Sequence, residues 1–225
     1  MELFLETIHA ADYQELMQFA DFKGAITSPR MFSSVNADVQ KSIDEMLEVL
    51  PENSLLFIPV IQTGFRNILR EARELASISG MIVPVIPFSP EGLMALKACY
   101  TLKIRAACSK IARPEEAVFA LNNRASFLLI SQRLARKSGT EKNMKQLLKT
   151  LKAEARTDPD SAPEVVVYDF CDLSEASGYL CADLADTALL ASQVREILDD
   201  QILKNEIEEE KDDWILAYTR MELFD

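Results

Sequence analysis

The sequence predicts an α/β protein that folds as a single (β/α)8 barrel, the TIM-barrel architecture, over residues 1–225. Eight short apolar segments recur along the chain, amphipathic segments separate them, and no GxGxxG or P-loop pattern follows any of them. The apolar segments are continuous rather than alternating, which is typical of parallel strands covered on both faces. A doubly wound open sheet is the alternative, and the missing phosphate-loop patterns disfavour its nucleotide-binding form.

The eight predicted strands share short length and an enrichment in β-branched and aromatic residues. Each is followed by a turn or by the start of a helical pattern, as a barrel requires. They are Leu3–Leu5, Gly24–Thr27, Leu55–Ile61, Met81–Ile86, Ile104–Cys108, Phe127–Ser131, Val165–Phe170 and Thr187–Ala191.

The segments between the strands show apolar residues at helical spacing or helix-start signals. Ser89-Pro90-Glu91 is typical of an N-cap followed by proline in the first turn. The other predicted helices cover residues 38–50, 63–79, 113–123, 140–155 and 174–184.

The chain continues past the last predicted strand into a helical extension over residues 192–220. Its acidic run, residues 206–213, is expected to face solvent, whereas Ile207, Trp214, Ile215 and Tyr218 are apolar and close to helical spacing. We expect this stripe to pack on a second copy of the chain, which makes the extension a candidate contact of a homo-oligomer.

Composition excludes several classes of partner and cofactor. The net charge of -12 argues against binding to DNA or RNA. No apolar run approaches the roughly 20 residues that a membrane span needs, and the N-terminal segment lacks signal-peptide features, so we expect a cytoplasmic protein. The four cysteines form no CxxC pair and His9 is the single histidine, so neither a metal nor another cofactor is expected.

Four segments in fixed order carry a resemblance to a known family. They read MELFLET at the start, GAITSP at 24–29, IPFSPEGLMALK at 86–97 and VVVYDF at 165–170. Together they resemble the small transaldolases and fructose-6-phosphate aldolases over nearly the whole chain. The resemblance implies a (β/α)8 barrel, aldol chemistry through a lysine Schiff base, and a pentameric or decameric ring held by the C-terminal helix.

The position that corresponds to the family's Schiff-base lysine is Val85 in this sequence. An apolar side chain cannot form an imine, so the covalent step of that chemistry is expected to be absent. The family's aspartate on the first strand corresponds to Glu6, which keeps a carboxylate on a longer side chain.

Other positions that match the family's active site have also changed. Ser28 stands at an asparagine, Pro59 at a glutamine, Ser109 at a threonine, and Ser131 at a tyrosine that handles a proton in the family. These changes remove amide donors and an acid–base group, so the resemblance leaves no intact catalytic set.

The resemblance also concerns ligand binding. Arg133 corresponds to the family's phosphate-binding arginine, and Asp169 replaces a serine beside it. A carboxylate there would repel a sugar phosphate, so we expect Glu6, Ser28, Ser109, Arg133 and Asp169 to bind a small neutral or cationic ligand.

Two functions remain open. The first is a transaldolase-like barrel without classical catalysis, a pseudoenzyme kept as an oligomeric ligand-binding or regulatory protein of carbohydrate metabolism. The alternative is an active carbon–carbon bond enzyme with relocated groups, either Lys110 after the fifth strand or a metal held by Glu6, Asp169, Asp172 and His9.

Overall fold

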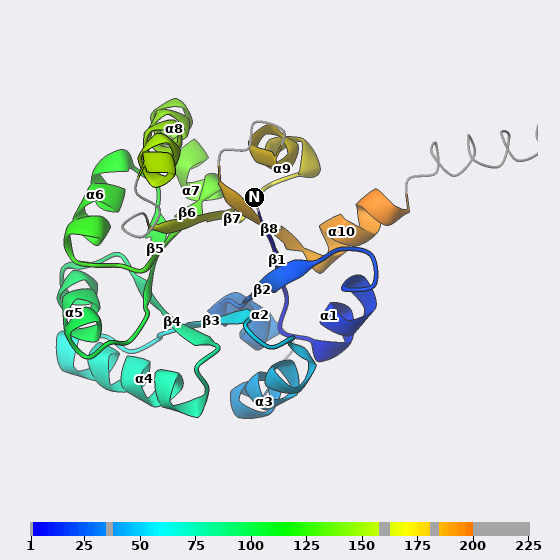
Figure 1. The fold of residues 1–225 in the computed structure, drawn as a ribbon, viewed down its shortest axis with the longest axis horizontal. Coiled ribbons are helices and arrows are strands. Elements are labelled where there is room, and N and C mark those ends of the chain that lie inside the picture. Colours follow the sequence, from blue (N-terminus) through cyan, green and yellow to red (C-terminus); the bar gives the residue numbers. More distant parts are fainter. Residues whose placement is uncertain (1, 35–37, 158–162, 181–184, 200–225) are drawn as a thin grey trace, which may run out of the picture. The chain divides into compact units, whose positions relative to one another are not determined.

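The computed structural model describes residues 2–34, 38–157, 163–180 and 185–199. Eight parallel strands close into a barrel in sequential order, β1 to β8, with β8 pairing back onto β1 (Figure 1). The predicted (β/α)8 fold is confirmed. The strands are β1 (Leu3–Glu6), β2 (Phe22–Ile26), β3 (Leu55–Pro59), β4 (Ile82–Pro87), β5 (Ala107–Ile111), β6 (Phe127–Ser131), β7 (Glu164–Tyr168) and β8 (Asp186–Leu190).

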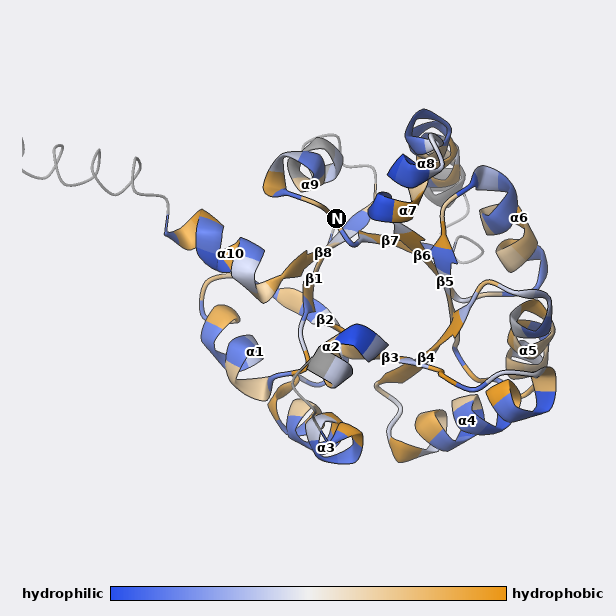
Figure 2. Ribbon diagram, turned by 180° about the vertical axis from the view of Figure 1, so that it is seen from behind, coloured by the Kyte–Doolittle hydropathy of each residue, from blue (hydrophilic) through white to orange (hydrophobic). Residues whose placement is uncertain are grey.

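Helices surround the barrel and turn their polar faces outward (Figure 2). Three short helices, α1, α2 and α7, were not predicted, because they contain only six or seven residues each and carry little periodicity. The helices are α1 (Ala10–Leu16), α2 (Pro29–Ser34), α3 (Val39–Val49), α4 (Phe65–Ile78), α5 (Pro90–Thr101), α6 (Pro114–Asn122), α7 (Gln132–Lys137), α8 (Glu141–Thr157), α9 (Leu173–Leu180) and α10 (Ala191–Leu198).

The predicted start of α5 is confirmed in detail. Ser89 is the N-cap, and its hydroxyl accepts a hydrogen bond from the Gly92 N–H at 2.9 Å. Pro90 occupies the first turn, where its missing N–H leaves no helical bond unmade. The cap therefore ends β4 and redirects the chain over the outside of the barrel.

The fifth strand lies three residues later than predicted, at Ala107–Ile111 instead of Ile104–Cys108. The residues before it close the end of α5: the Ile104 N–H bonds to the Cys99 carbonyl at 2.9 Å, and Lys103 is left-handed with φ 60°. Ile104 is thus part of a helix-terminating turn. This shift places Lys110 inside β5 rather than after it.

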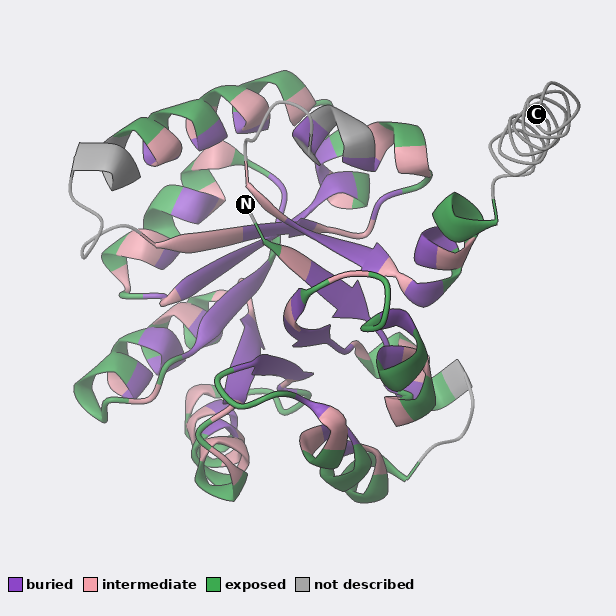
Figure 3. Ribbon diagram, turned by 45° about the vertical axis from the view of Figure 1, so that its right-hand side comes forward, coloured by how far each residue is buried: buried purple, intermediate pink, exposed green. Residues whose placement is uncertain are grey.

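The barrel interior is filled by side chains, and buried residues follow the strands (Figure 3). Phe57 lies edge-on between Phe4 and Phe127, with ring centroids 5.5 and 5.1 Å apart. Such edge-to-face pairs pack densely and contribute beyond simple area burial. Gly24 lets β2 approach β3 closely, because a Cβ at that position would lie 1.9 Å from the Leu55 carbonyl oxygen.

The chain divides into two compact units, Met1–Ala191 and Ser192–Asp225. The first unit contains the whole barrel. In the second, the structure describes residues 192–199, most of them in α10, so the predicted extension over 192–220 lies largely outside the described residues. Among the described helices, none combines the length and apolar character needed to cross a membrane.

Candidate functional site

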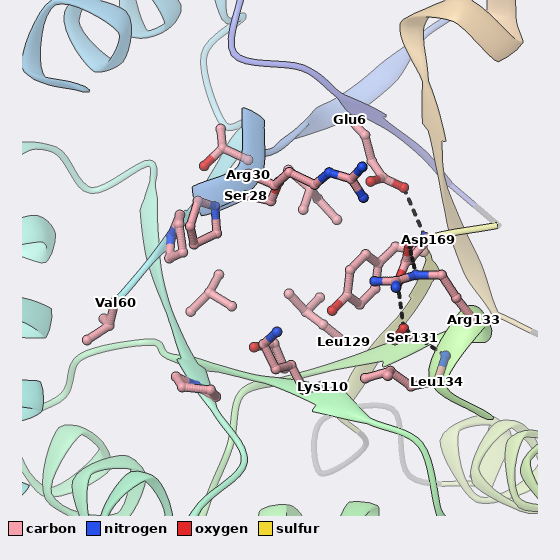
Figure 4. Close-up of a pocket in the computed structure, with 18 residues that line it drawn as sticks. Glu6, Ser28, Arg30, Val60, Lys110, Leu129, Ser131, Arg133, Leu134 and Asp169 are labelled. Atoms are coloured by element: carbon pink, nitrogen blue, oxygen red, sulfur yellow. Dashed lines mark hydrogen bonds and ion pairs between the residues drawn. The ribbon is translucent and has the colours of Figure 1, made fainter. Parts of the chain in front are cut away.

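A cavity of about 380 Å³ opens where the strands end, at the C-terminal rim of the barrel (Figure 4). Parallel strands bring their carboxyl ends to one rim, so residues that are distant in the sequence meet there. All eight predicted site residues line this cavity: Glu6, Ser28, Pro59, Val85, Ser109, Ser131, Arg133 and Asp169.

The floor of the cavity is the top of the barrel core. Ile26, Val85 and Leu129 belong both to the core cluster and to the cavity lining, and Tyr168 of the lining packs against this cluster. The site thus rests on packed side chains instead of opening into a channel through the barrel.

Val85 sits in this floor, 6% exposed, between Pro59 of β3 and Ala107 of β5 in the strand register. Both neighbours lack a side-chain donor. This part of the floor is therefore an apolar patch bounded by apolar residues.

Asp169 joins three strands at the rim. It follows β7, and its carboxylate accepts hydrogen bonds from the Ser131 hydroxyl at 2.8 Å and from Arg133 Nε at 3.0 Å to each oxygen. Its main-chain N–H donates to Glu6 Oε1 at 3.1 Å. Asp169 holds these contacts with φ 65°, a left-handed conformation that is strained for a residue with a Cβ.

Glu6 is the buried carboxyl of the site. It is 9% exposed, and burial raises its pKa from 4.5 to about 7, since water no longer solvates the charge. The Asp169 N–H opposes this shift, and the negative charge of the Asp169 carboxylate adds to it. A carboxyl group that titrates near neutral pH can both hold and release a proton, as general acid–base work requires.

The two predicted site serines at helix starts have structural partners. The Ser131 hydroxyl caps α7 by accepting from the Leu134 N–H at 3.2 Å, while it donates to Asp169. The Ser28 hydroxyl accepts from the Met31 N–H of α2 at 3.4 Å. Ser131 is therefore a structural link between β6, α7 and Asp169.

Lys110 lines the cavity because β5 bulges. Three steps along β5, from Cys108 to Ile111, match two steps along β6, so one extra residue is inserted. Regular alternation after Ala107 and Ser109 would point Lys110 away from the interior. Instead Lys110 takes φ 60° and reaches the cavity beside Ser109.

Two residues that the sequence reasoning did not select also line the cavity. Tyr168, beside Asp169, lines the cavity; burial raises its pKa, and the Lys110 main chain opposes this shift. Arg30 follows Pro29 just after β2. The sequence could have indicated Tyr168 through the period-two alternation of β7, and Arg30 as a cation just beyond the end of a strand.

The alternative metal site is not assembled as expected. Glu6 and Asp169 are adjacent, but Asp172 caps α9 by accepting from the Ser174 hydroxyl and the Glu175 N–H, and exposed His9 precedes α1. Within the described ranges, the carboxylates close enough to share an ion lie at the opposite, N-terminal rim, beside Lys23. They are Glu2, Glu164 and Asp186.

Cys99 in α5 and Cys108 in β5 are buried, whereas Cys171, after β7, is exposed. Burial raises the pKa of Cys99 to about 11 and of Cys108 to about 12, with the charge of Glu116 adding to the second shift. A thiolate is the reactive form, so neither is a nucleophile at neutral pH.

The sequence is similar to that of proteins named probable transaldolase. The match is 27% identical over 128 residues for the protein of Petrotoga mobilis, 27% for that of Clostridium perfringens and 25% for that of Aquifex aeolicus. It covers 57% of this chain and 57–59% of those proteins, so the chain spans a little over half the length of the curated relatives it matches. No family model matches the sequence.

Solved structures show the same fold at low identity. A HpcH/HpaI aldolase/citrate lyase family protein from Burkholderia cenocepacia superposes with a TM-score of 0.56 at 12% identity, covering 92% of this chain and 94% of that chain. Dihydrodipicolinate synthase from Rhodopseudomonas palustris gives 0.54 at 10% identity, covering 97% and 81%. The chain is thus a (β/α)8 barrel protein, similar in sequence to proteins named probable transaldolase.

Proposed function

We propose that this protein is a transaldolase-like barrel that binds a small ligand at the barrel mouth without strand-four Schiff-base chemistry. The observation that carries the proposal is Val85, which occupies the floor of the cavity as a buried apolar residue. The similarity to proteins named probable transaldolase supports a ligand from carbohydrate metabolism.

The neighbouring positions support the loss of classical catalysis. Pro59 offers no side-chain donor, and the Ser131 hydroxyl is engaged by Leu134 and Asp169. Groups that act together in catalysis lose most of their effect when one is removed, so further losses are expected once the nucleophile is gone. The cavity itself remains open and polar on its rim, which suits ligand binding.

The proposal includes a homo-oligomer, pentameric or decameric, formed through the C-terminal extension. Its support is the apolar stripe Ile207, Trp214, Ile215 and Tyr218 in the sequence, which lies outside the described residues. Such a ring would not depend on an amine at position 85, so it can persist without catalysis.

The test is reductive trapping. The protein is incubated with dihydroxyacetone or fructose 6-phosphate, treated with borohydride, and its intact mass is measured. We expect no stable adduct, because the amine that would form the imine is absent from strand four. A stoichiometric adduct would contradict the proposal.

A second candidate function rests on Lys110, whose side chain reaches the cavity from β5. An imine at Lys110 would restore covalent aldol chemistry from another strand. Schiff-base lysines are usually desolvated, whereas Lys110 is exposed, which disfavours this candidate. Trapping that is lost in Lys110→Gly but kept in Lys103→Gly would support it.

A further inference from the structure

The charges at the cavity mouth differ from those of the whole chain. The protein carries a net charge of -12, yet three cations line the cavity, Arg30, Lys110 and Arg133, against the two acids Glu6 and Asp169. A local excess of positive charge in a cleft focuses the electric field there and attracts anions.

Ion pairing among these five groups decides which charges remain available to a ligand. Arg133 binds both oxygens of Asp169 at 3.0 Å, so that carboxylate is compensated within the protein. Glu6 is buried, and its pKa of about 7 leaves it only partly charged at neutral pH. Arg30 and Lys110 form no ion pair with any residue in the described ranges.

The backbone of β5 directs Lys110 to the cavity. The β5 bulge inserts one residue, and Lys110 adopts φ 60°. A left-handed conformation is unfavourable for a residue with a Cβ, and bulges that re-aim side chains occur next to functional sites. The other left-handed lysine, Lys103, lies in the turn before β5 and does not line the cavity.

We propose that Arg30 and Lys110 form a subsite for the phosphate or carboxylate group of a small organic anion bound in the barrel cavity. The subsite rests on the proposed ligand-binding function and names its ligand class. It differs from the expectation of a neutral or cationic ligand because that expectation counted Asp169 as an unpaired charge. Its cations lie on β5 and at the start of α2, and neither takes part in the Arg133–Asp169 ion pair (Figure 4).

Calorimetric titration with three matched probes tests the ligand class: glycerol 3-phosphate, glycerate and glycerol. They share a three-carbon skeleton and differ in the phosphate, carboxylate or hydroxyl at one end. We expect at least one of the two anions to bind about tenfold or more tightly than glycerol, the usual effect of one charge-assisted contact. The stronger anion identifies the headgroup; equal binding of all three probes would overturn the proposal.

Paired variants test the residues. Lys110→Gly and Lys103→Gly each remove one positive charge and each place glycine at φ 60°, where it is well tolerated. We expect Lys110→Gly and Arg30→Gln each to weaken anion binding about tenfold, with Lys103→Gly within about twofold of the wild type. Unchanged binding in both Lys110→Gly and Arg30→Gln, or equal weakening in Lys103→Gly, would refute the subsite.

The binding result and the trapping result are independent. An imine adduct would contradict the proposed function whatever the affinities. Missing anion dependence without an adduct would remove the Arg30–Lys110 subsite and leave the proposed ligand-binding barrel in place.

Discussion

The main-chain N–H of Asp169 donates a hydrogen bond to Glu6 Oε1 at 3.1 Å, and this contact joins the end of β7 to the end of β1 across β8. Through it, the strained backbone of one acid positions the buried carboxyl of another. The carboxylate of Asp169 also accepts hydrogen bonds from Ser131 of β6 and from Arg133 of α7. One residue therefore organises one side of the cavity rim.

Burial of Glu6 predicts a stability that depends on pH. Because the folded-state pKa is raised from 4.5 to about 7, the folded protein keeps a proton that the unfolded chain releases first. Stability from this group is then full below pH 4.5 and falls as the pH rises towards 7, by about 3 kcal/mol in total. Glu6→Gln should remove this part of the slope in denaturant unfolding at several pH values.

Glu48→Gln is the matched control, since Glu48 is exposed on α3. It should leave the pH dependence of unfolding as in the wild type. A Glu6→Gln protein with the same slope between pH 4.5 and 7 as the wild type would show that Glu6 is charged in the fold.

The φ of 65° at Asp169 predicts an unusual order among its substitutions. Asp169→Ala and Asp169→Gly both lose the carboxylate contacts, but only alanine keeps a Cβ in the left-handed region. We expect the glycine variant to be more stable by about 1 kcal/mol in equilibrium unfolding.

Lys149, inside α8, is the control, and there we expect the opposite order of stability for the glycine and alanine variants. There Lys149→Gly should be less stable than Lys149→Ala by about 1 kcal/mol, because glycine is a poor helix former. The same order at both positions would argue against backbone strain at Asp169.

Placing an amine on strand four at position 85 tests whether the neighbouring residues also prevent classical catalysis. Val85→Lys should not yield cleavage of fructose 6-phosphate at ordinary enzyme rates, about 1 per second or more, because Pro59 supplies no donor and Ser131 is engaged structurally. Steady-state assays of the wild type and the variant measure this. Turnover regained by the single change would show that position 85 was the main loss.

The C-terminal extension predicts assembly. Leaving Ile207, Trp214, Ile215 and Tyr218 in water forgoes roughly 1.5–3 kcal/mol for each large side chain, so we expect an oligomer well above a dimer in light scattering. Truncation at about residue 205 should yield a smaller species. A full-length chain that remains monomeric at micromolar concentration would contradict this prediction.

The sequence by itself determined the barrel and which residues lie at its C-terminal rim. Continuous apolar runs separated by amphipathic segments can bury both strand faces only under surrounding helices, and all eight predicted strands formed, with β5 displaced. Because parallel strands end at one rim, residues chosen as strand-end positions, such as Glu6 and Asp169, necessarily meet.

Tertiary structure alone decided the electrostatics of that rim. The pairing of Asp169 with Arg133 depends on β6 and β7 lying side by side, and the raised pKa of Glu6 depends on burial, which no local pattern reports. Lys110 faces the cavity only because one residue is inserted in β5 relative to β6, a register difference that exists between strands and not within either sequence. Such long-range terms set which charges are compensated and which remain available to a ligand, so a charge argument made from composition alone does not decide the ligand class.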